Sequence, residues 1–286
     1  MSGTSTTPTI VSHDMDTRSH HPDGTPKHMG FFTDTSICIG CKACEVACKE
    51  WNQVPEDGLN WTGESYDNTS SLGANTWRHV AFVEQTRPLQ AADPQGNDGL
   101  RWLMASDVCK HCAHAACLDV CPTGALTRTE FGTVVVQSDV CNGCGYCVPA
   151  CPFGVIDKRE EDGRVWKCTL CYDRLRGDME PACAQACPTK SIQFGEIGEL
   201  MRLASERVET LHARGVAQAQ LYGHDRDNGV GGFGAFFLLL DEPEVYGLPP
   251  DPVVTTRDLG RMWGVAAAAA LSMVAGLGAA MLRHRS

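Results

Sequence analysis

The sequence has too little positive charge for a nucleic-acid-binding protein. Its 286 residues include 24 lysines and arginines against 35 aspartates and glutamates, which gives a net charge of -11. Proteins that bind DNA or RNA need a basic face to meet the phosphate backbone. We therefore expect no nucleic-acid partner. The hydrophobic content of 43% is still sufficient for a buried globular core.

The sequence also lacks the motifs that would make this chain an enzyme by itself. The C-x3-C-x2-C run of a radical S-adenosylmethionine enzyme does not occur, and no combination of residues suits a general base, a nucleophile or an open metal site. The glycine-rich GVGGFGAFFLLL from Gly229 is not set in a G-x-G-x-x-G context, so it indicates a turn leading into a buried strand. We expect no catalytic residue.

No cysteine lies outside a motif, because all sixteen fall into four groups of four. Groups one and three have the spacing C-x2-C-x2-C-x3-C, which bacterial ferredoxins use to hold cubane [4Fe–4S] clusters. Groups two and four keep the ending C-x3-C-P, with Pro122 and Pro188 after the last cysteine. The four groups are Cys38, Cys41, Cys44, Cys48; Cys109, Cys112, Cys117, Cys121; Cys141, Cys144, Cys147, Cys151; and Cys168, Cys171, Cys183, Cys187.

Two other uses of cysteine fit the sequence less well. Disulfide frameworks are typical of short, cysteine-dense secreted chains, whereas this chain has 16 cysteines in 286 residues. Structural zinc uses paired C-x2-C motifs, and group four alone could serve it, but three cysteines at strict two-residue spacing favour a cubane. We therefore expect four [4Fe–4S] clusters, and a zinc-stapled membrane adaptor is the alternative from a different class.

The fourth cysteine of each group is expected to bind the cluster of another group. In two-cluster ferredoxins the last cysteine of one run ligates the other cluster, so the groups must act in pairs. A turn at Phe131-Gly132 and a β-rich Thr133 to Gln137 predict a hairpin that joins groups two and three into one module. Groups one and four would then pair in a nested order. Sequential pairing, one with two and three with four, remains open from the spacing alone.

Three further stretches, together with the cysteine groups, carry a resemblance to a known family. KCTLCYDR at Lys167 to Arg174, EPACAQACPT at Glu180 to Thr189 and YGLPPDP at Tyr246 to Pro252 resemble the iron–sulfur β subunit of respiratory, membrane-bound formate dehydrogenase. The resemblance covers about residues 31 to 283. The cysteine groups alone indicate the wider class of four-cluster electron-transfer subunits of molybdopterin oxidoreductases, and YGLPPDP with the closing helix narrows it.

The resemblance implies the nested pairing, and four four-iron clusters because every ligand position is a cysteine. The implied ligand sets are Cys38, Cys41, Cys44 with Cys187; Cys168, Cys171, Cys183 with Cys48; Cys109, Cys112, Cys117 with Cys151; and Cys141, Cys144, Cys147 with Cys121.

The function that the resemblance implies is electron transfer within a membrane complex. The chain would pass single electrons from a molybdenum- or tungsten-bis-pterin catalytic α subunit, which oxidises formate, to a membrane cytochrome b γ subunit that reduces quinone. The alternatives within the class are the equivalent subunit of a membrane-bound [NiFe] hydrogenase or of another molybdopterin oxidoreductase, including a reductase that runs in the opposite direction.

The C-terminal region predicts a membrane anchor. Met262 to Leu282 are 21 consecutive uncharged residues, and as a helix they would extend about 31 Å, the thickness of a bilayer core. The many alanines and glycines would also suit a buried soluble helix, or close packing against another membrane subunit. We expect a single-pass anchor that contacts lipid.

Charge does not orient this anchor in the membrane. Arg257 and Arg261 before it are matched by Arg283 and Arg285 after it. The first thirty residues contain neither a secretory hydrophobic region nor a twin-arginine pair. The resemblance therefore implies that the cysteine domain lies on the outer face of the cytoplasmic membrane, exported with a partner that carries the signal.

The expected fold is α+β, with two interlocked ferredoxin-like modules holding four clusters and one C-terminal transmembrane helix. The expected segments are a disordered polar tail at 1–30, an outer module at 31–100 and 159–255, an inner module at 101–158, and an anchor with a short tail at 256–286.

Some residues near the cysteines have two interpretations. We interpret His111 and His114 as solvent-facing or packing residues, although they could hydrogen-bond near a cluster. Lys167, beside Cys168, is interpreted as a surface lysine rather than a charge that tunes a cluster. Glycines between the ligands of group three, Gly143 and Gly145, are expected to let backbone amides approach the cluster sulfurs.

Overall fold

A four-stranded sheet at the centre of the body is built from distant parts of the chain. Strand β1 (Met29–Asp34) runs antiparallel to β8 (Ile192–Glu196) and parallel to β10 (Ala235–Leu239), and β9 (Gln220–Tyr222) completes the sheet beside β10. Every residue of β10 is buried, which explains its unbroken apolar sequence. The strand expected after the glycine-rich turn is therefore confirmed.

The computed structural model describes residues 20–21, 23–58, 61–63, 66–86 and 100–284. Most of the predicted disordered tail lies outside these residues, and its last two residues, Met29 and Gly30, already belong to β1.

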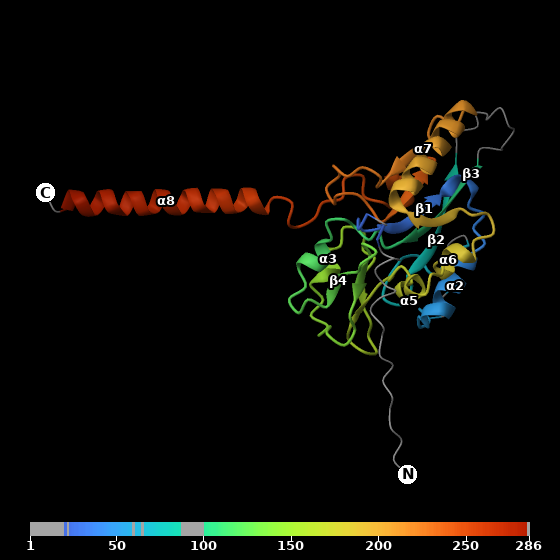
Figure 1. Cartoon of the computed structure of the whole chain (residues 1–286), viewed down its shortest axis with the longest axis horizontal. Helices are drawn as coiled ribbons and strands as arrows, with labels where there is room; N and C mark the ends of the chain where they lie inside the picture. Colours follow the sequence, from blue (N-terminus) through green and yellow to red (C-terminus); the bar gives the residue numbers. More distant parts are fainter. Residues whose placement is uncertain (1–19, 22, 59–60, 64–65, 87–99, 285–286) are drawn as a thin grey trace, which may run out of the picture.

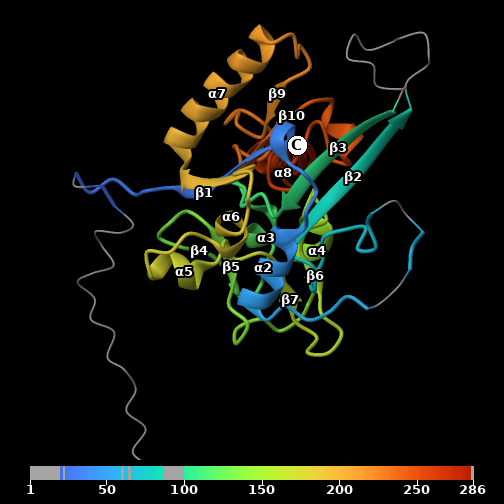
Figure 2. The same cartoon turned by 90° about the vertical axis from the view of Figure 1, so that its right-hand side faces the viewer.

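One long helix packs on the central sheet. Helix α7 (Ile197–Ala213) follows β8 directly and contacts β1, β8 and β9 (Figure 2). Its buried side chains include Leu200, Ala204 and Leu211, which recur at helical spacing on one face. The helix predicted between Glu199 and Arg214 is confirmed.

Three antiparallel hairpins complete the β structure. The longest pairs β2 (Arg78–Thr86) with β3 (Leu100–Val108), and Figure 2 shows it extending away from the body. The hairpin predicted between groups two and three is confirmed as β4 (Leu126–Arg128) and β5 (Val134–Val136). A third hairpin joins β6 (Asp157–Lys158) to β7 (Val165–Trp166). Strand β3 lies in the segment predicted as the inner module but pairs with β2 of the outer one.

Short helices accompany the cysteine groups. They are α2 (Ala43–Asn52), α3 (Ala116–Asp119), α4 (Cys147–Ala150), α5 (Tyr172–Arg176) and α6 (Ala182–Gln185), with single 3-10 turns at η1 (Thr35–Ile37) and η2 (Pro243–Tyr246).

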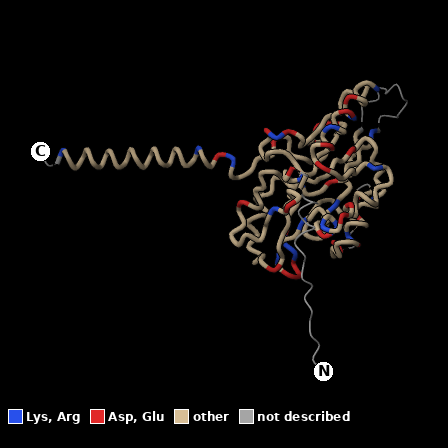
Figure 3. The backbone as a smooth tube through the Cα atoms, in the orientation of Figure 1, with Lys and Arg blue, Asp and Glu red and all other residues tan. Residues whose placement is uncertain are grey.

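The last helix leaves the body altogether. Helix α8 (Leu259–His284) extends into empty space in Figure 1, and no part of its apolar window is buried against the rest of the protein. Charged residues are spread over the body but are absent from α8 between Arg261 and Arg283, as Figure 3 shows. Among the described residues, α8 is the one helix long and apolar enough to cross a membrane. It is a candidate single-pass anchor.

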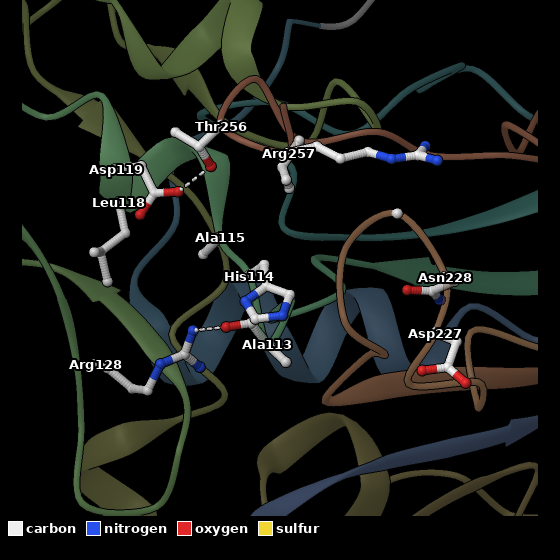
Figure 4. A pocket seen from close by; sticks show the side chains of 12 residues that line it. Ala113, His114, Ala115, Leu118, Asp119, Arg128, Asp227, Asn228, Thr256 and Arg257 are labelled. Carbon is white, nitrogen blue, oxygen red and sulfur yellow. Dashed lines mark hydrogen bonds between the residues drawn. The ribbon is translucent and has the colours of Figure 1, made fainter. Parts of the chain in front are cut away.

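The segment before α8 is attached to the loop of group two. The hydroxyl of Thr256 donates a hydrogen bond to Asp119 at the end of α3, with an oxygen–oxygen distance of 2.9 Å (Figure 4). Val254 donates its backbone N–H to the carbonyl of Gly229, and the loop after Gly229 bonds the backbone of Ala113 and His114 in turn. The membrane-proximal end of the body is therefore the group-two loop.

Candidate iron–sulfur sites

Each cysteine group consists of a wrapped loop followed by a short helix. The third cysteine of every group lies at the start of its helix, and the fourth follows four residues later: Cys44 and Cys48 on α2, Cys117 and Cys121 at α3, Cys147 and Cys151 at α4, Cys183 and Cys187 at α6. The loops contain left-handed residues, among them Leu170 (φ 58°) and Cys171 (φ 48°). Such turns bend the chain sharply, so several thiols can face one centre.

Groups one and four meet although more than a hundred residues separate them. Helix α2 packs on α6, and the amide nitrogen of Asn52 lies 3.7 Å from the sulfurs of both Cys48 and Cys171. Burial, and then repulsion from Cys168, Cys183 and Cys171, raises the pKa of Cys48. The last thiol of group one is therefore surrounded by the first three thiols of group four.

Groups two and three share an enclosed cavity. Its empty volume is about 370 Å³, and it is lined by Cys109, Cys112 and Cys117 of group two together with Cys151 of group three. The remaining walls are mostly apolar, among them Val134. Four thiols around a dry cavity are a donor set suited to a cubane cluster.

The same grouping appears in the apolar cores. One core contains cysteines of groups one and four with Cys109, and a second contains Cys147 with neighbouring cysteines of groups two and three. Burial and then repulsion from Cys109 raise the pKa of Cys168 to about 12, so these two residues mark the place where the two sets of groups approach each other.

The buried thiols hold their protons until a cation replaces them. Burial raises the pKa of Cys44 to about 11 and that of Cys117 to about 12. A thiol ligand must be deprotonated, so iron binding here would release protons. Among the residues that the structure describes, no three His, Cys, Asp or Glu side chains are close enough to hold a single metal ion.

A buried arginine lies between groups one and four. Arg78 is 2% exposed, donates from one terminal nitrogen to the sulfur of Cys183 at 3.2 Å, and from the other to the carbonyl of Ser106 at 3.2 Å. Its guanidinium also lies 4.8 Å from the ring centre of Phe31. The nearby charge of Cys44 also affects its pKa, so this cation lies close to both groups. Sequence analysis missed Arg78, because nothing in its neighbourhood signals burial.

Lys167 is not a surface residue, and that interpretation was wrong. It is 1% exposed, and its ammonium donates to the carbonyls of Val134 and Cys168. The thiols of Cys109, Cys117 and Cys168 all favour its charged form. Lys167 is buried because the end of β7 brings it against β5, which places one cation at the junction between the two sets of groups.

The two histidines of group two have different surroundings. His114 is exposed and lines an open pocket beside Thr256 and Arg128 (Figure 4). His111 is 3% exposed, and its Nδ1 accepts the backbone N–H of Val134 at 3.1 Å. Burial, followed by the positive charges of Lys167 and Arg128, lowers the pKa of His111 well below its usual value. A solvent-facing His111 is therefore excluded, and its ring stays neutral.

Gly143 has a packing role that its sequence position did not indicate. At φ 70° a Cβ atom would lie 2.0 Å from the carbonyl oxygen of Gly163, in the turn of the β6–β7 hairpin. A side chain here would push that hairpin away. The expected approach of the Gly143 and Gly145 amides to sulfur stays a prediction.

Comparison with known proteins supports the cluster chemistry. Two family profiles described as 4Fe-4S dicluster domains match residues 37–125 and 100–197. The two matches overlap at group two, so they identify the type of domain without dividing the cysteines into pairs. Two dicluster domains and sixteen cysteines fit four [4Fe–4S] clusters.

Curated relatives narrow the family. The iron-sulfur subunit of the nitrate-inducible formate dehydrogenase of Escherichia coli (strain K12) is 42% identical over 251 residues, which cover 85% of this chain and 81% of that protein. The formate dehydrogenase-O iron-sulfur subunit of the same organism is 43% identical over 78% of this chain and 71% of its own length. The B subunit of the anaerobic dimethyl sulfoxide reductase of Escherichia coli is 36% identical over 60% of this chain and 76% of its own length.

Identity above 40% over most of both chains joins the matching dicluster domains and the sixteen-cysteine pattern. The chain therefore belongs to the formate dehydrogenase iron–sulfur subunits, a family of electron-transfer subunits of molybdopterin oxidoreductase complexes.

Proposed function

We propose that this chain relays single electrons from a molybdenum- or tungsten-bis-pterin catalytic subunit that oxidises formate to a membrane cytochrome b that reduces quinone. The relay would use four [4Fe–4S] clusters, each of which exchanges one electron at a time when bound. The proposed ligand sets are Cys38, Cys41, Cys44, Cys187; Cys168, Cys171, Cys183, Cys48; Cys109, Cys112, Cys117, Cys151; and Cys141, Cys144, Cys147, Cys121.

The cavity between groups two and three is the observation that supports these sets best. Three of its thiols come from group two and the fourth, Cys151, is the last cysteine of group three. Sequential pairing would instead direct Cys151 toward group four. The thiols of Cys168, Cys171 and Cys183 around Cys48 support the same exchange in the outer pair.

The arrangement of the body supports an order of transfer. Lys167 lies close to thiols of both sets of groups, so the outer sites adjoin the inner ones there. The inner sites in turn lie next to the anchor, because Asp119 on α3 binds Thr256 just before α8. We infer that electrons enter at the outer module, cross at Lys167 and leave from the inner module toward the membrane partner.

Formate-dependent reduction of the clusters tests this function directly. The complex is isolated from membranes through a tag on this chain, without oxygen, and formate is added while cluster absorption and EPR signals are followed. Rapid reduction of signals from this chain is the expected result. Dithionite serves as the control, since it reduces any intact cluster whatever the natural substrate.

Reduction by dithionite but not by formate would retain the electron relay and reject the substrate. Hydrogen would then be tested as the donor. The likeness to a subunit of dimethyl sulfoxide reductase gives a second candidate, a relay running toward an oxidised substrate. In that case dimethyl sulfoxide should oxidise the reduced clusters.

The anchor and its orientation form the second part of the proposal. We infer that α8 spans the cytoplasmic membrane with the cysteine domain on the outer face, exported with a signal-bearing partner. A chain that lacks residues 262–282 should appear in the soluble fraction with its clusters. Retention of this variant on membranes would mean that partner subunits, and not α8, hold the body there.

A further inference from the structure

One buried donor beside the inner sites has no partner. His111 lies between Cys109 and Cys112 in the chain, and its ring is 3% exposed. Its Nε2 atom is shielded from solvent and makes no hydrogen bond with any described residue. Nearly all buried polar groups in folded proteins have a partner, so this atom requires an explanation.

The hydrogen bond on the opposite side of the ring determines which nitrogen is the donor. The backbone N–H of Val134 donates to Nδ1 at 3.1 Å, which occupies the lone pair of that nitrogen. A ring that accepts at Nδ1 carries its hydrogen at Nε2. His111 therefore presents an unpaired N–H inside the protein.

This N–H belongs to a residue that lines the cavity of the inner thiols. Cys109, Cys112, Cys117 and Cys151 form part of the wall of that cavity, together with His111. The ring also lines an open pocket near Met29, but the shielding of Nε2 excludes a solvent partner there.

The two lysines of the same wall already have acceptors. Lys110 donates to Asp107 and to the carbonyl of Val108, and Lys167 donates to the carbonyls of Val134 and Cys168. The unpaired donor among the described residues of this wall is thus the imidazole of His111.

We propose that His111 donates its Nε2–H to a sulfur of the cluster held by Cys109, Cys112, Cys117 and Cys151, and thereby raises the reduction potential of that cluster. The inference rests on the proposed ligand set. A hydrogen bond to sulfur stabilises the more negative, reduced form of a cluster, and it is a known determinant of potential. No bond is made or broken at His111.

The backbone at His111 offers a matched pair of variants. Its φ of 45° is left-handed, a conformation that asparagine tolerates well, and Gln53 occupies a similar φ of 49° elsewhere in the chain. In His111→Asn the side-chain oxygen can still accept from Val134, but the amide is too short to replace Nε2. In His111→Gln the amide nitrogen reaches the Nε2 position, while the acceptor for Val134 is lost.

Redox titration of the purified complex by EPR separates the two functions of the ring. The signal of this cluster is the one that a Cys117→Ser variant alters. His111→Asn should lower its ratio of reduced to oxidised form about tenfold at a fixed potential, a shift of about 59 mV to more negative values. The potentials of the other clusters should stay unchanged, and His111→Gln should stay near the parent value.

The opposite outcomes are distinct. A parent complex without iron–sulfur signals would refute the proposed function itself. Intact clusters with the same potential in His111→Asn and the parent would overturn only the role of His111. Equal shifts in the asparagine and glutamine variants would also overturn it, because they would show that the bond to Val134 matters and the donor does not.

A second measurement leaves His111 in place and so avoids any change of fold at this position. The parent complex is labelled with ¹⁵N-histidine, reduced, and examined by pulsed EPR. The expected result is a ¹⁵N coupling to the cluster that Cys117→Ser identifies. The absence of any histidine coupling to this cluster would exclude the hydrogen bond.

Discussion

The two sets of cysteine groups differ in how deeply the protein covers them. In groups one and four, six of the eight cysteines are buried: Cys44, Cys48, Cys168, Cys171, Cys183 and Cys187. In groups two and three only Cys109 and Cys147 are buried, and the other six are intermediate or exposed. The outer sites therefore lie inside the body, and the inner sites lie nearer its surface.

The difference follows from how each set is assembled. The outer groups come from opposite ends of the sequence and are held by the central sheet, the β2–β3 hairpin and a buried cation. The inner groups are joined by the short β4–β5 hairpin and need little cover of their own. A covered site keeps solvent from its cluster, whereas a shallow site near the anchor allows a partner to approach closely. Burial and access are thus divided between the two sets.

The largest expected effect comes from removing a shared ligand. Cys48→Ala should damage the cluster of Cys168, Cys171 and Cys183 more than the cluster of Cys38, Cys41 and Cys44, because the fourth thiol serves the other group. The matched inner variant, Cys151→Ala, should damage the cluster of Cys109, Cys112 and Cys117. Cluster-resolved EPR and iron content measure both. Damage confined to the group that contains the replaced cysteine would refute the nested pairing.

The next effect concerns access to the clusters. When the purified complex is treated with ferricyanide, the inner clusters should lose iron several-fold faster than the outer ones, since their cysteines are less buried. EPR spectra recorded during the treatment follow each cluster. Equal rates would show that partner subunits, rather than this chain, control access.

A smaller effect is expected from the buried cation of the outer sites. Arg78→Met should shift the potentials of the outer clusters to more negative values by roughly 100 mV, because a unit charge at about 7 Å in an effective dielectric of about 20 contributes about 2 kcal/mol. Arg78→Lys keeps the charge and should shift them less. Redox titration measures the difference. A shift of the inner clusters instead would reject the placement of Arg78 at the outer sites.

The smallest effect lies in the segment that covers the outer module. Asp67 accepts from the ring of His79 at 2.6 Å and from the backbone N–H groups of Thr69 and Ser70. Burial raises its pKa, but the bond to His79 and the two backbone bonds outweigh burial, so the pKa falls below its ordinary value of 3.8. Asp67→Asn should therefore destabilise the protein by about 1 to 2 kcal/mol at neutral pH.

The sign of this effect gives a pH test. A carboxylate with a lowered pKa adds stability that is fully present above the ordinary pKa and is lost as the pH falls through the lower, folded value. The difference in unfolding temperature between the parent and Asp67→Asn should be present at pH 7 and shrink in acid. A difference that grows in acid would contradict the assignment.

Much of this molecule could be predicted from local sequence. The cysteine groups, the hairpin after Phe131, helix α7 and the apolar α8 depend on spacing and periodicity within a few turns of chain, and each can be recognised there. Arg78, His111 and Lys167 could not be recognised in that way. Their importance comes from burial between segments that meet only in the folded chain, and a lone basic residue has no periodic pattern.

The central sheet also has a consequence for the time order of biosynthesis. Strand β1 is among the first structured segments to leave the ribosome, yet its partners β8 and β10 emerge more than 150 residues later. Groups two and three are both available once residue 151 has been made, well before group four is complete at Cys187. The inner hairpin module can therefore mature while translation continues, whereas the outer module must wait, with group one unpaired, until the chain is almost finished.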